Sequence, residues 1–309
     1  MKLEKMESFS SQTKLMLTGE YAVLKGALSL ALPLKFTQNL SISTSPGDQK
    51  LIWKSLIGND LWFKNILLLP DFQVIETNNP ELTVTLSQIL ANAKNLNPDF
   101  LTGHDEFEVT SIMDFNPLWG IGSSSSLISN IAFWANCDPF ELNDMIFNGS
   151  GYDIACARSS SPIVYQIEDN KPSFRVSKFN PVFKDKLYFV YLNRKQNSKE
   201  SVLKSDISGI KQNQILALSE LTLDFEASNE LEEFQFLMEK HEEIIADIIQ
   251  IKPVKSLLFN DFKGSIKSLG AWGGDFILVA SNATEEYVRD YFMKRELNTI
   301  FRFEEIVKQ

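Results

Sequence analysis

A glycine- and serine-rich segment, Gly-Ile-Gly-Ser-Ser-Ser-Ser at residues 120–126, separates two segments with different periodicities. Residues 107–113 before it are typical of a strand, and residues 127–135 after it carry apolar side chains at helical spacing. Serine is a common N-cap, so the pattern predicts a strand, a glycine loop and a helix whose first N–H groups point into the loop. Glycines allow close backbone approach and a helix N-terminus attracts anions, so this loop can bind phosphate. The alternative is a flexible connector, and the Gly-Lys-Ser/Thr ending of a P-loop is absent.

The rest of the chain alternates between short strand patterns and helix patterns, which favours an α+β fold. We predict strands at residues 14–24, 27–36, 39–45, 50–57, 60–69, 107–113, 187–192, 275–280 and 298–307. We predict further helices at residues 80–96, 199–220, 230–250 and 284–293. The third of these begins with a capping-box pattern of Asn229 and Glu232. A domain junction is expected between residues 165 and 185.

The charge of the chain restricts its partners. The formal net charge is −10, and an acidic surface repels phosphate backbones and anionic lipids, so we expect neither nucleic acid nor membrane as a partner. No apolar run reaches the roughly 18 residues needed to span a bilayer. Residues 1–10 lack the apolar core of a signal peptide, and we expect a cytoplasmic protein. Cys137 and Cys156 do not have metal-ligand spacing and are expected to be plain buried thiols.

Two further glycine clusters are candidates for chemistry. Gly-Ser-Gly-Tyr-Asp-Ile-Ala at residues 149–155 forms a tight turn that can present Asp153 at the start of a helix or strand. A lone Asp in such a turn is more commonly an Asx-turn or a helix cap. Leu-Gly-Ala-Trp-Gly-Gly-Asp at residues 269–275 precedes a strand, and its alternative interpretation is a simple turn.

Together the clusters resemble the motifs of the GHMP kinases, which phosphorylate galactose, homoserine, mevalonate and phosphomevalonate. The first motif resembles TKLMLTGEYAVLKGALSLALPL at residues 13–34, the second resembles GIGSSSS, and the third resembles GAWGGD. They follow the family's order across residues 15–275. The resemblance implies a two-domain fold, with a ribosomal-protein-S5-like N-terminal, ATP-binding domain at residues 1–175 and a ferredoxin-like C-terminal domain at residues 176–309. The segment at residues 149–155 is most similar to phosphomevalonate kinases and to a bacterial subgroup labelled by Gly-Tyr-Asp-Ile-Ala.

The resemblance also implies roles for individual residues. Asp153 would act as the base or orienting acceptor for the attacking oxygen, and Lys14 would keep Asp153 ionised and stabilise the transferred charge. The implied ATP ligands are Gly120, Ile121, Gly122, Ser123, Ser124, Ser125 and Ser126. The implied substrate ligands are Glu20, Ser150, Gly151, Lys195, Ser198, Gly270, Ala271, Gly273 and Gly274. A charged surface loop is an equal alternative for Lys195 and Ser198.

The implied cofactors are ATP and Mg²⁺, since phosphoryl transfer requires charge neutralisation on the phosphates. Ser124 matches the family's Mg²⁺-binding serine. Glu141 is the expected acidic ligand, and Asp144 is the alternative because the register shifts there.

The histidines and two tryptophans are expected to have structural positions. His241 lies on the apolar face of a predicted helix and is expected in the core, whereas His104 is expected on the surface. Trp53 and Trp62 could flank adenine, but apolar packing is the preferred interpretation.

Three positions depart from the family pattern. Trp119 stands where phosphomevalonate kinases tend to have lysine, Trp272 stands where the family has glycine, and Thr13 replaces the usual glycine before the first-motif lysine. An indole at residue 272 could crowd the substrate loop. A protein that kept the fold and lost catalysis would show such changes.

The expected function is therefore ATP-dependent phosphoryl transfer to a small acidic metabolite, with 5-phosphomevalonate first. The alternatives are a mevalonate kinase or another alcohol kinase, a diphosphomevalonate-decarboxylase-like enzyme, and a silent binding protein. The expected partner is a small-molecule substrate, and the chain is expected to be a monomer or homodimer.

Overall fold

The computed structural model describes residues 5–147, 149–194, 209–270, 272 and 274–309. The chain forms two compact units, and neither is one continuous segment. Unit 1 contains residues 1–13, 36–117 and 122–158, and unit 2 contains residues 14–35, 118–121 and 159–309. The domains predicted from the sequence are consecutive segments, and their boundary between residues 175 and 176 stays a prediction.

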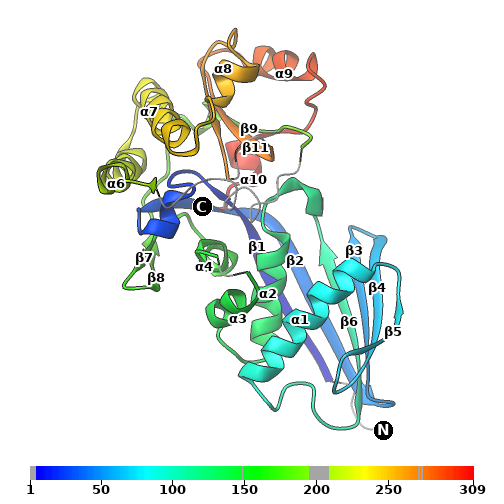
Figure 1. The fold of residues 1–309 in the computed structure, drawn as a ribbon. Coiled ribbons are helices and arrows are strands. Elements are labelled where there is room, and N and C mark those ends of the chain that lie inside the picture. Colours follow the sequence, from blue (N-terminus) through cyan, green and yellow to red (C-terminus); the bar gives the residue numbers. More distant parts are fainter. Residues whose placement is uncertain (1–4, 148, 195–208, 271, 273) are drawn as a thin grey trace. The chain divides into compact units, whose positions relative to one another are not determined.

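Unit 1 is built around a mixed sheet (Figure 1). Strands β3 (Lys50–Ile57) and β4 (Asp60–Leu68) form an antiparallel hairpin, and β5 (Gln73–Thr77) pairs with β4. Strand β6 (Asp105–Met113) runs parallel to β3 and antiparallel to β2 (Ser29–Pro46), with Gln38 opposite Met113. Strand β1 (Lys5–Met16) also pairs with β2.

Four helices of unit 1 complete its core. They are α1 (Pro80–Leu96), α2 (Ser123–Trp134), α3 (Pro139–Phe147) and α4 (Tyr152–Arg158), and α1, α2 and α3 pack against one another. Along β3, β4 and β6, buried residues alternate with more exposed ones, as the period of two requires. The shared core includes Leu40, Ile42, Leu51, Trp53, Leu67, Leu86, Leu90, Val109, Ile128 and Ile131.

One part of unit 2 contains two paired strands and two long helices. The first residues of β2 pair with β7 (Ile163–Glu168), which pairs with β8 (Lys171–Val176). Helix α6 (Gln212–Ala227) packs against α7 (Leu231–Ile249). Their apolar faces enclose part of the first motif in a cluster of Tyr21, Ala22, Ala27, Leu218, Ile245, Ile249 and Trp272.

A four-stranded antiparallel sheet forms the rest of unit 2. Its order is β10 (Ser265–Ser268), β11 (Phe276–Ala280), β9 (Leu187–Tyr191) and β12 (Ile300–Arg302). Strands β9 and β11 are buried along their whole length. Helices α8 (Val254–Leu258), α9 (Glu285–Met293) and α10 (Phe303–Ile306) accompany this sheet.

The structure confirms the predicted junction at the glycine loop, with β6 before it and α2 after it. It also confirms strands at 50–57 and 60–69 and the helices at 80–96, 230–250 and 284–293 within a residue or two. The helix predicted at 199–220 begins at Gln212 in the described part of the chain, and residues 195–208 lie outside it.

Four local predictions are wrong. The strands predicted at residues 27–36 and 39–45 are one continuous strand, β2. Residues 18–26 are a buried turn with a 3₁₀ helix at Ala22–Lys25, because Gly19, Tyr21 and Gly26 have φ of 85°, 61° and 85°. The final strand stops at Arg302, where a capping interaction with Glu305 starts α10. No side chain caps α7, whose N-cap is Glu230, and the Asn229 side chain donates to the Ala227 carbonyl instead. Apolar composition alone cannot distinguish a buried turn from a buried strand.

Candidate active site

The second half of the glycine loop opens helix α2 in unit 1. Gly122 is the N-cap residue and has φ of 98°, a conformation that favours glycine. No side chain caps the helix, so the N–H groups of its first turn are not bound by a capping side chain. Ser124 is exposed and Ser123 is half-buried, so both can reach a ligand at this helix end.

The last two serines of the loop are buried, and their hydroxyls are hydrogen-bonded within unit 1. The Ser125 hydroxyl donates to the Gly122 carbonyl at 3.0 Å. Ser126 is fully buried, its hydroxyl donates to Gln38 Oε1 at 2.6 Å, and its N–H donates to the Gly122 carbonyl. Ser126 was expected to bind ATP, but its donors are already used within unit 1. The run of four serines conceals this difference, because successive residues of a helix point to different faces and only those three or four positions apart share one.

The first half of the loop lies in unit 2, together with the predicted lysine. The backbone N–H of Lys14 donates to the Ile121 carbonyl at 2.8 Å, so the first and second motifs meet there. Gly120 has φ of 71°, and a β-carbon at this residue would lie 2.5 Å from both carboxylate oxygens of Asp275. Asp275 is 5% exposed and was not among the predicted site residues. The Gly-Gly-Asp ending of the third motif was the signal for it.

Asp153 lies in unit 1, in the first turn of α4. It is half-buried, and its Oδ1 accepts from the Ile154 N–H at 3.2 Å. The buried Gly151 accepts from Ile154 and Ala155 through its carbonyl, so it begins the helix. The α4 helix is fixed to α2 because Arg158 Nε donates to the Ser129 hydroxyl at 2.8 Å.

The carboxylates proposed for the metal lie on α3. Glu141 is in its first turn, Asp144 follows one turn later, and both are exposed. Carboxylate and hydroxyl oxygens suit Mg²⁺, so the donor types of Ser124 and Glu141 fit the cation. Among the described residues, no group of three or more His, Cys, Asp or Glu side chains gathers into a metal site.

Glu20 has a different position from the one expected of a substrate ligand. It is 2% exposed in unit 2, and its Oε1 lies 2.5 Å from Lys267 Nζ. Its Oε2 lies 3.2 Å from Nε2 of His241 on α7. Glu242, the next residue of α7, is also buried and accepts from the Ser268 N–H at 2.9 Å. We call Glu20, His241, Glu242 and Lys267 the buried charge cluster.

Not every titratable group of the buried charge cluster is charged, because burial favours the neutral forms. His241 Nε2 accepts from the Gly19 N–H at 2.9 Å, so in the neutral ring the proton is on Nδ1. Burial lowers the pKa of His241 well below its usual value. Burial also raises the pKa of Glu20, although Lys267 opposes this change, and it raises the pKa of Glu242 to about 8. One lysine cannot balance two carboxylates, so one carboxyl retains its proton near neutral pH.

This proton predicts a pH dependence of stability. A carboxyl whose pKa rises from 4.5 in the unfolded chain to about 8 in the folded chain stabilises the fold below pH 4.5, and this contribution is lost as the pH rises to about 8. We expect the unfolding free energy of the wild type, minus that of Glu242→Gln, to fall across this interval in urea titrations. A flat difference between pH 4.5 and 8 would contradict a proton on Glu242.

The two tryptophans that depart from the family pattern are packed in unit 2. Trp272 is 4% exposed and joins the cluster around Tyr21, whose hydroxyl accepts from the backbone N–H of Trp272 at 3.1 Å. Trp119 packs edge-on against Phe276 and Phe301, with ring centroids 6.2 and 5.4 Å away. Each indole therefore has an aromatic or apolar environment within unit 2.

Other predictions have mixed outcomes. His241 and Trp53 are in the core and His104 is on the surface, as predicted, but Trp62, which was also expected to pack among apolar side chains, is exposed. Cys156 is buried and Cys137 half-buried, and both are free thiols. Gly270 has φ of 67° with open space beside it, Gly274 is buried, and Ser150 is half-buried. Lys195, Ser198, Ala271 and Gly273 lie outside the described residues.

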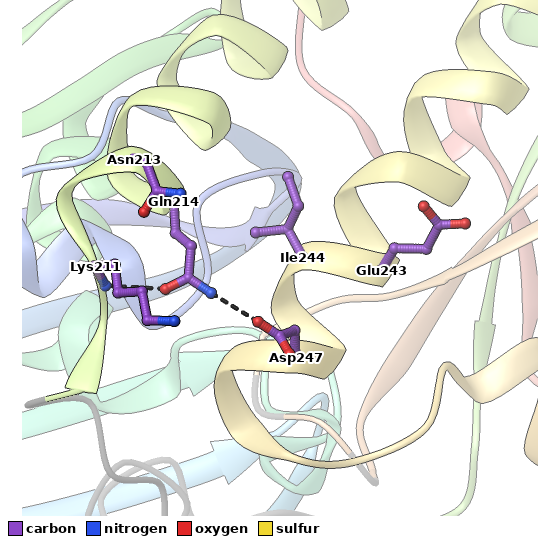
Figure 2. Close-up of a pocket in the computed structure, with 6 residues that line it drawn as sticks. All are labelled: Lys211, Asn213, Gln214, Glu243, Ile244 and Asp247. Carbon is purple, nitrogen blue, oxygen red and sulfur yellow. Dashed lines mark hydrogen bonds between the residues drawn. The ribbon is translucent and has the colours of Figure 1, made fainter.

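A separate hollow of about 270 Å³ lies between α6 and α7 (Figure 2). Gln214 Nε2 donates to Asp247 Oδ2 at 2.9 Å across it, and the Lys211 N–H donates to Gln214 Oε1. The remaining lining residues are Asn213, Glu243 and Ile244, and none of them was predicted to be functional. This hollow is a polar helix–helix groove, and it is not the candidate active site.

The chain has the α+β fold of the GHMP kinases. Over 99% of both chains it superimposes on Methanococcus jannaschii mevalonate kinase with a TM-score of 0.70 at 17% identity. It matches Streptococcus pneumoniae phosphomevalonate kinase in complex with phosphomevalonate and AMPPNP with a TM-score of 0.71 at 17% identity, over 96% of this chain and 99% of that one. Lactococcus lactis galactokinase complexed with galactose gives 0.67 at 13% identity, over 98% and 93%.

These three likenesses are likenesses of fold. No protein-family model matches the sequence, and no curated protein matches it either. No helix among the described residues is both long enough and apolar enough to span a membrane.

Proposed function

We propose that the protein is an ATP-dependent small-molecule kinase. The observation that carries the proposal is the convergence of the three motifs in unit 2. Lys14 of the first motif is hydrogen-bonded through its backbone to Ile121 of the second, and Asp275 at the end of the third packs against Gly120. Three segments far apart in sequence would not meet at a glycine loop if each were a simple turn.

The helix end at Gly122 suits the phosphates of ATP. Its first-turn N–H groups and the hydroxyls of Ser123 and Ser124 can donate to phosphate oxygens. Mg²⁺ would be held by oxygen ligands from Ser124 and from Glu141 or Asp144, and when bound it would neutralise charge on the phosphates.

Asp153 and Lys14 would serve the transferred group. Asp153 would accept the proton of the attacking hydroxyl, and Lys14 would stabilise the developing charge. Asp153 is half-buried and is therefore not enclosed in the core of unit 1.

We propose 5-phosphomevalonate as the first substrate to test. Residues 149–155 are most similar to phosphomevalonate kinases, and one structural neighbour is described with phosphomevalonate and AMPPNP. A mevalonate kinase, another alcohol kinase and a decarboxylase-like enzyme share the fold and the loop. A silent binding protein was favoured by Trp119 and Trp272, but the packing of both indoles inside unit 2 weakens that argument.

A coupled assay of ADP release tests the proposal. The purified protein is given MgATP and, in turn, 5-phosphomevalonate, mevalonate, galactose or homoserine, and a reaction without acceptor gives the background ATPase rate. One acceptor is expected to raise ADP release well above this background. Binding of MgATP without release above background for any acceptor would favour the silent binding protein.

MgATP should stabilise the protein against heat, because a ligand at 100 times its Kd increases the free energy of unfolding by about 2.7 kcal/mol. Gly122→Ala should remove most of this shift, since the new methyl group occupies the helix end that would receive the phosphates. Gly103→Ala is the matched control, because Gly103 has φ of 92° and open space beside it. Differential scanning fluorimetry with and without MgATP measures both variants. Equal shifts in the two variants would show that the loop does not receive phosphate.

A further inference from the structure

The segment that leads into the glycine loop, residues 118–121, is held in unit 2 by contacts along its whole length. The Leu118 carbonyl accepts from the Tyr191 hydroxyl at 3.0 Å, and Trp119 packs on Phe276 and Phe301. The Ile121 carbonyl accepts from the Lys14 N–H, and Ile121 is 2% exposed. We call residues 118–121 the loop entry.

Asp275 lies directly in front of Gly120 in the loop entry. A β-carbon at Gly120 would collide with its carboxylate, 2.5 Å from each oxygen. A contact this short with the carboxylate of a buried residue is one that β-carbons essentially never make, so one of the two residues would have to move. The carboxyl group of Asp275 therefore occupies the space that a side chain at residue 120 would need.

The backbone of Asp275 is fixed at the end of the four-stranded sheet. Its N–H donates to the Arg194 carbonyl at 2.6 Å, and its carbonyl accepts from the Leu192 N–H at 2.8 Å. Its φ of 53° is a left-handed conformation that few residues other than glycine adopt, although Asp and Asn do so more readily than most. Left-handed non-glycine residues persist only where surrounding contacts hold them in place.

Tyr191 flanks the same segment from strand β9. Its hydroxyl donates to Leu118, and its ring lies 5.4 Å from that of Phe276. Burial raises the pKa of the Tyr191 hydroxyl, and the charge of Asp275 raises it further, so the hydroxyl stays protonated and remains a donor. Tyr191 and Asp275 thus lie near one another and act on neighbouring residues of the loop entry.

We propose that Asp275 is a positioning residue for nucleotide binding, whose side chain fills the space in front of Gly120 and sets the path of the glycine loop before Gly122. Asp275 needs no contact with the nucleotide in this role. The inference rests on the proposed function, because it assumes that the loop binds ATP. The role depends on the shape of the side chain at residue 275. Asparagine, which has the same shape as aspartate, should therefore preserve the role, and glycine, which has no side chain, should not.

Isothermal titration with AMPPNP and Mg²⁺ tests the proposal in four variants. Asp275→Asn should keep Kd within about threefold of the wild type, and Asp275→Gly should weaken binding about tenfold because the loop entry loses its support. Gly120→Ala should weaken binding more than tenfold. The double variant Gly120→Ala/Asp275→Gly should bind more tightly than Gly120→Ala, because the overlap has been removed.

Controls separate this proposal from the kinase assignment and from general instability. Gly58→Ala has a comparable φ of 57° and open space, so it reports backbone strain alone and should bind AMPPNP like the wild type. Melting temperatures of all variants are measured without ligand. If the wild type binds and Asp275→Gly binds equally well, or if the double variant shows no recovery, the positioning role is wrong while the kinase assignment stands. A wild type that binds no AMPPNP would overturn both.

Discussion

Asp153→Asn is expected to lower kcat by about a hundredfold or more with the best acceptor, as for loss of a positioned base. The Asp153 Oδ1 accepts from the Ile154 N–H, and the amide oxygen of Asn can accept the same bond. The substitution therefore removes the charge and keeps the local structure of α4. Binding of MgATP and the melting temperature should change little.

The measurement is steady-state kinetics with the acceptor found in the ADP-release assay, paired with a thermal melt. Asp224→Asn is the control, because Asp224 is an exposed Asp within helix α6 and has no predicted role. A ratio of wild-type to mutant kcat near one would remove Asp153 from the mechanism. The kinase assignment would survive that result, because the phosphate loop does not depend on this carboxyl.

Lys267→Met is expected to destabilise the protein by about 3–5 kcal/mol, the cost of removing one partner from a buried ion pair. Lys267 is fully buried, its Nζ lies 2.5 Å from Glu20 Oε1, and it also donates to the Ser268 carbonyl. Methionine has a similar length but no charge, so two buried carboxyls would lose their cation. Urea denaturation at neutral pH measures the loss.

The double variant Lys267→Met/Glu20→Gln should recover much of that stability. It leaves Glu242 as the remaining carboxyl of the cluster, and burial, the largest cause of its raised pKa in the wild type, still favours its neutral form. Lys240→Met is the surface control, since Lys240 pairs with Glu243 at 2.8 Å in an exposed position. An exposed pair of this kind contributes about 0–1 kcal/mol. If Lys267→Met costs no more than Lys240→Met, the cluster does not depend on its charge.

The part of the fold that could be predicted from the sequence is the part with a local signal. The strand, loop and helix around residues 107–135 were predictable, because the apolar residues repeat with a strand-like period of two residues before the glycine loop and a helical period of 3.6 residues after it. His241 could be assigned to the core because it lies on the apolar face of its predicted helix. The order of the three motifs predicted the fold, although that prediction depends on a resemblance of motifs rather than on periodicity.

The remaining features depend on contacts between distant residues. Glu20 could not be recognised as buried, because its partners His241 and Lys267 are more than 200 residues away in the chain. Trp272 was expected to crowd a loop, but its neighbours in the core come from α6, α7 and the turn at Tyr21. The Gly-Gly-Asp ending of the third motif is a sequence signal for Asp275, but the close approach of its carboxylate to Gly120 depends on residues 155 positions apart and follows only from the folded structure.

The discontinuity of unit 2 affects how this protein can be dissected. A fragment of residues 176–309 would contain Lys267, His241 and Glu242 but would lack Glu20, which supplies the carboxylate nearest Lys267. It would also lack Tyr21, Ala22 and Ala27, so the apolar faces of α6 and α7 would be exposed to water. The two halves of the gene product are therefore not independent folding modules, and a truncated chain that fails to bind a metabolite reveals nothing about which half recognises it.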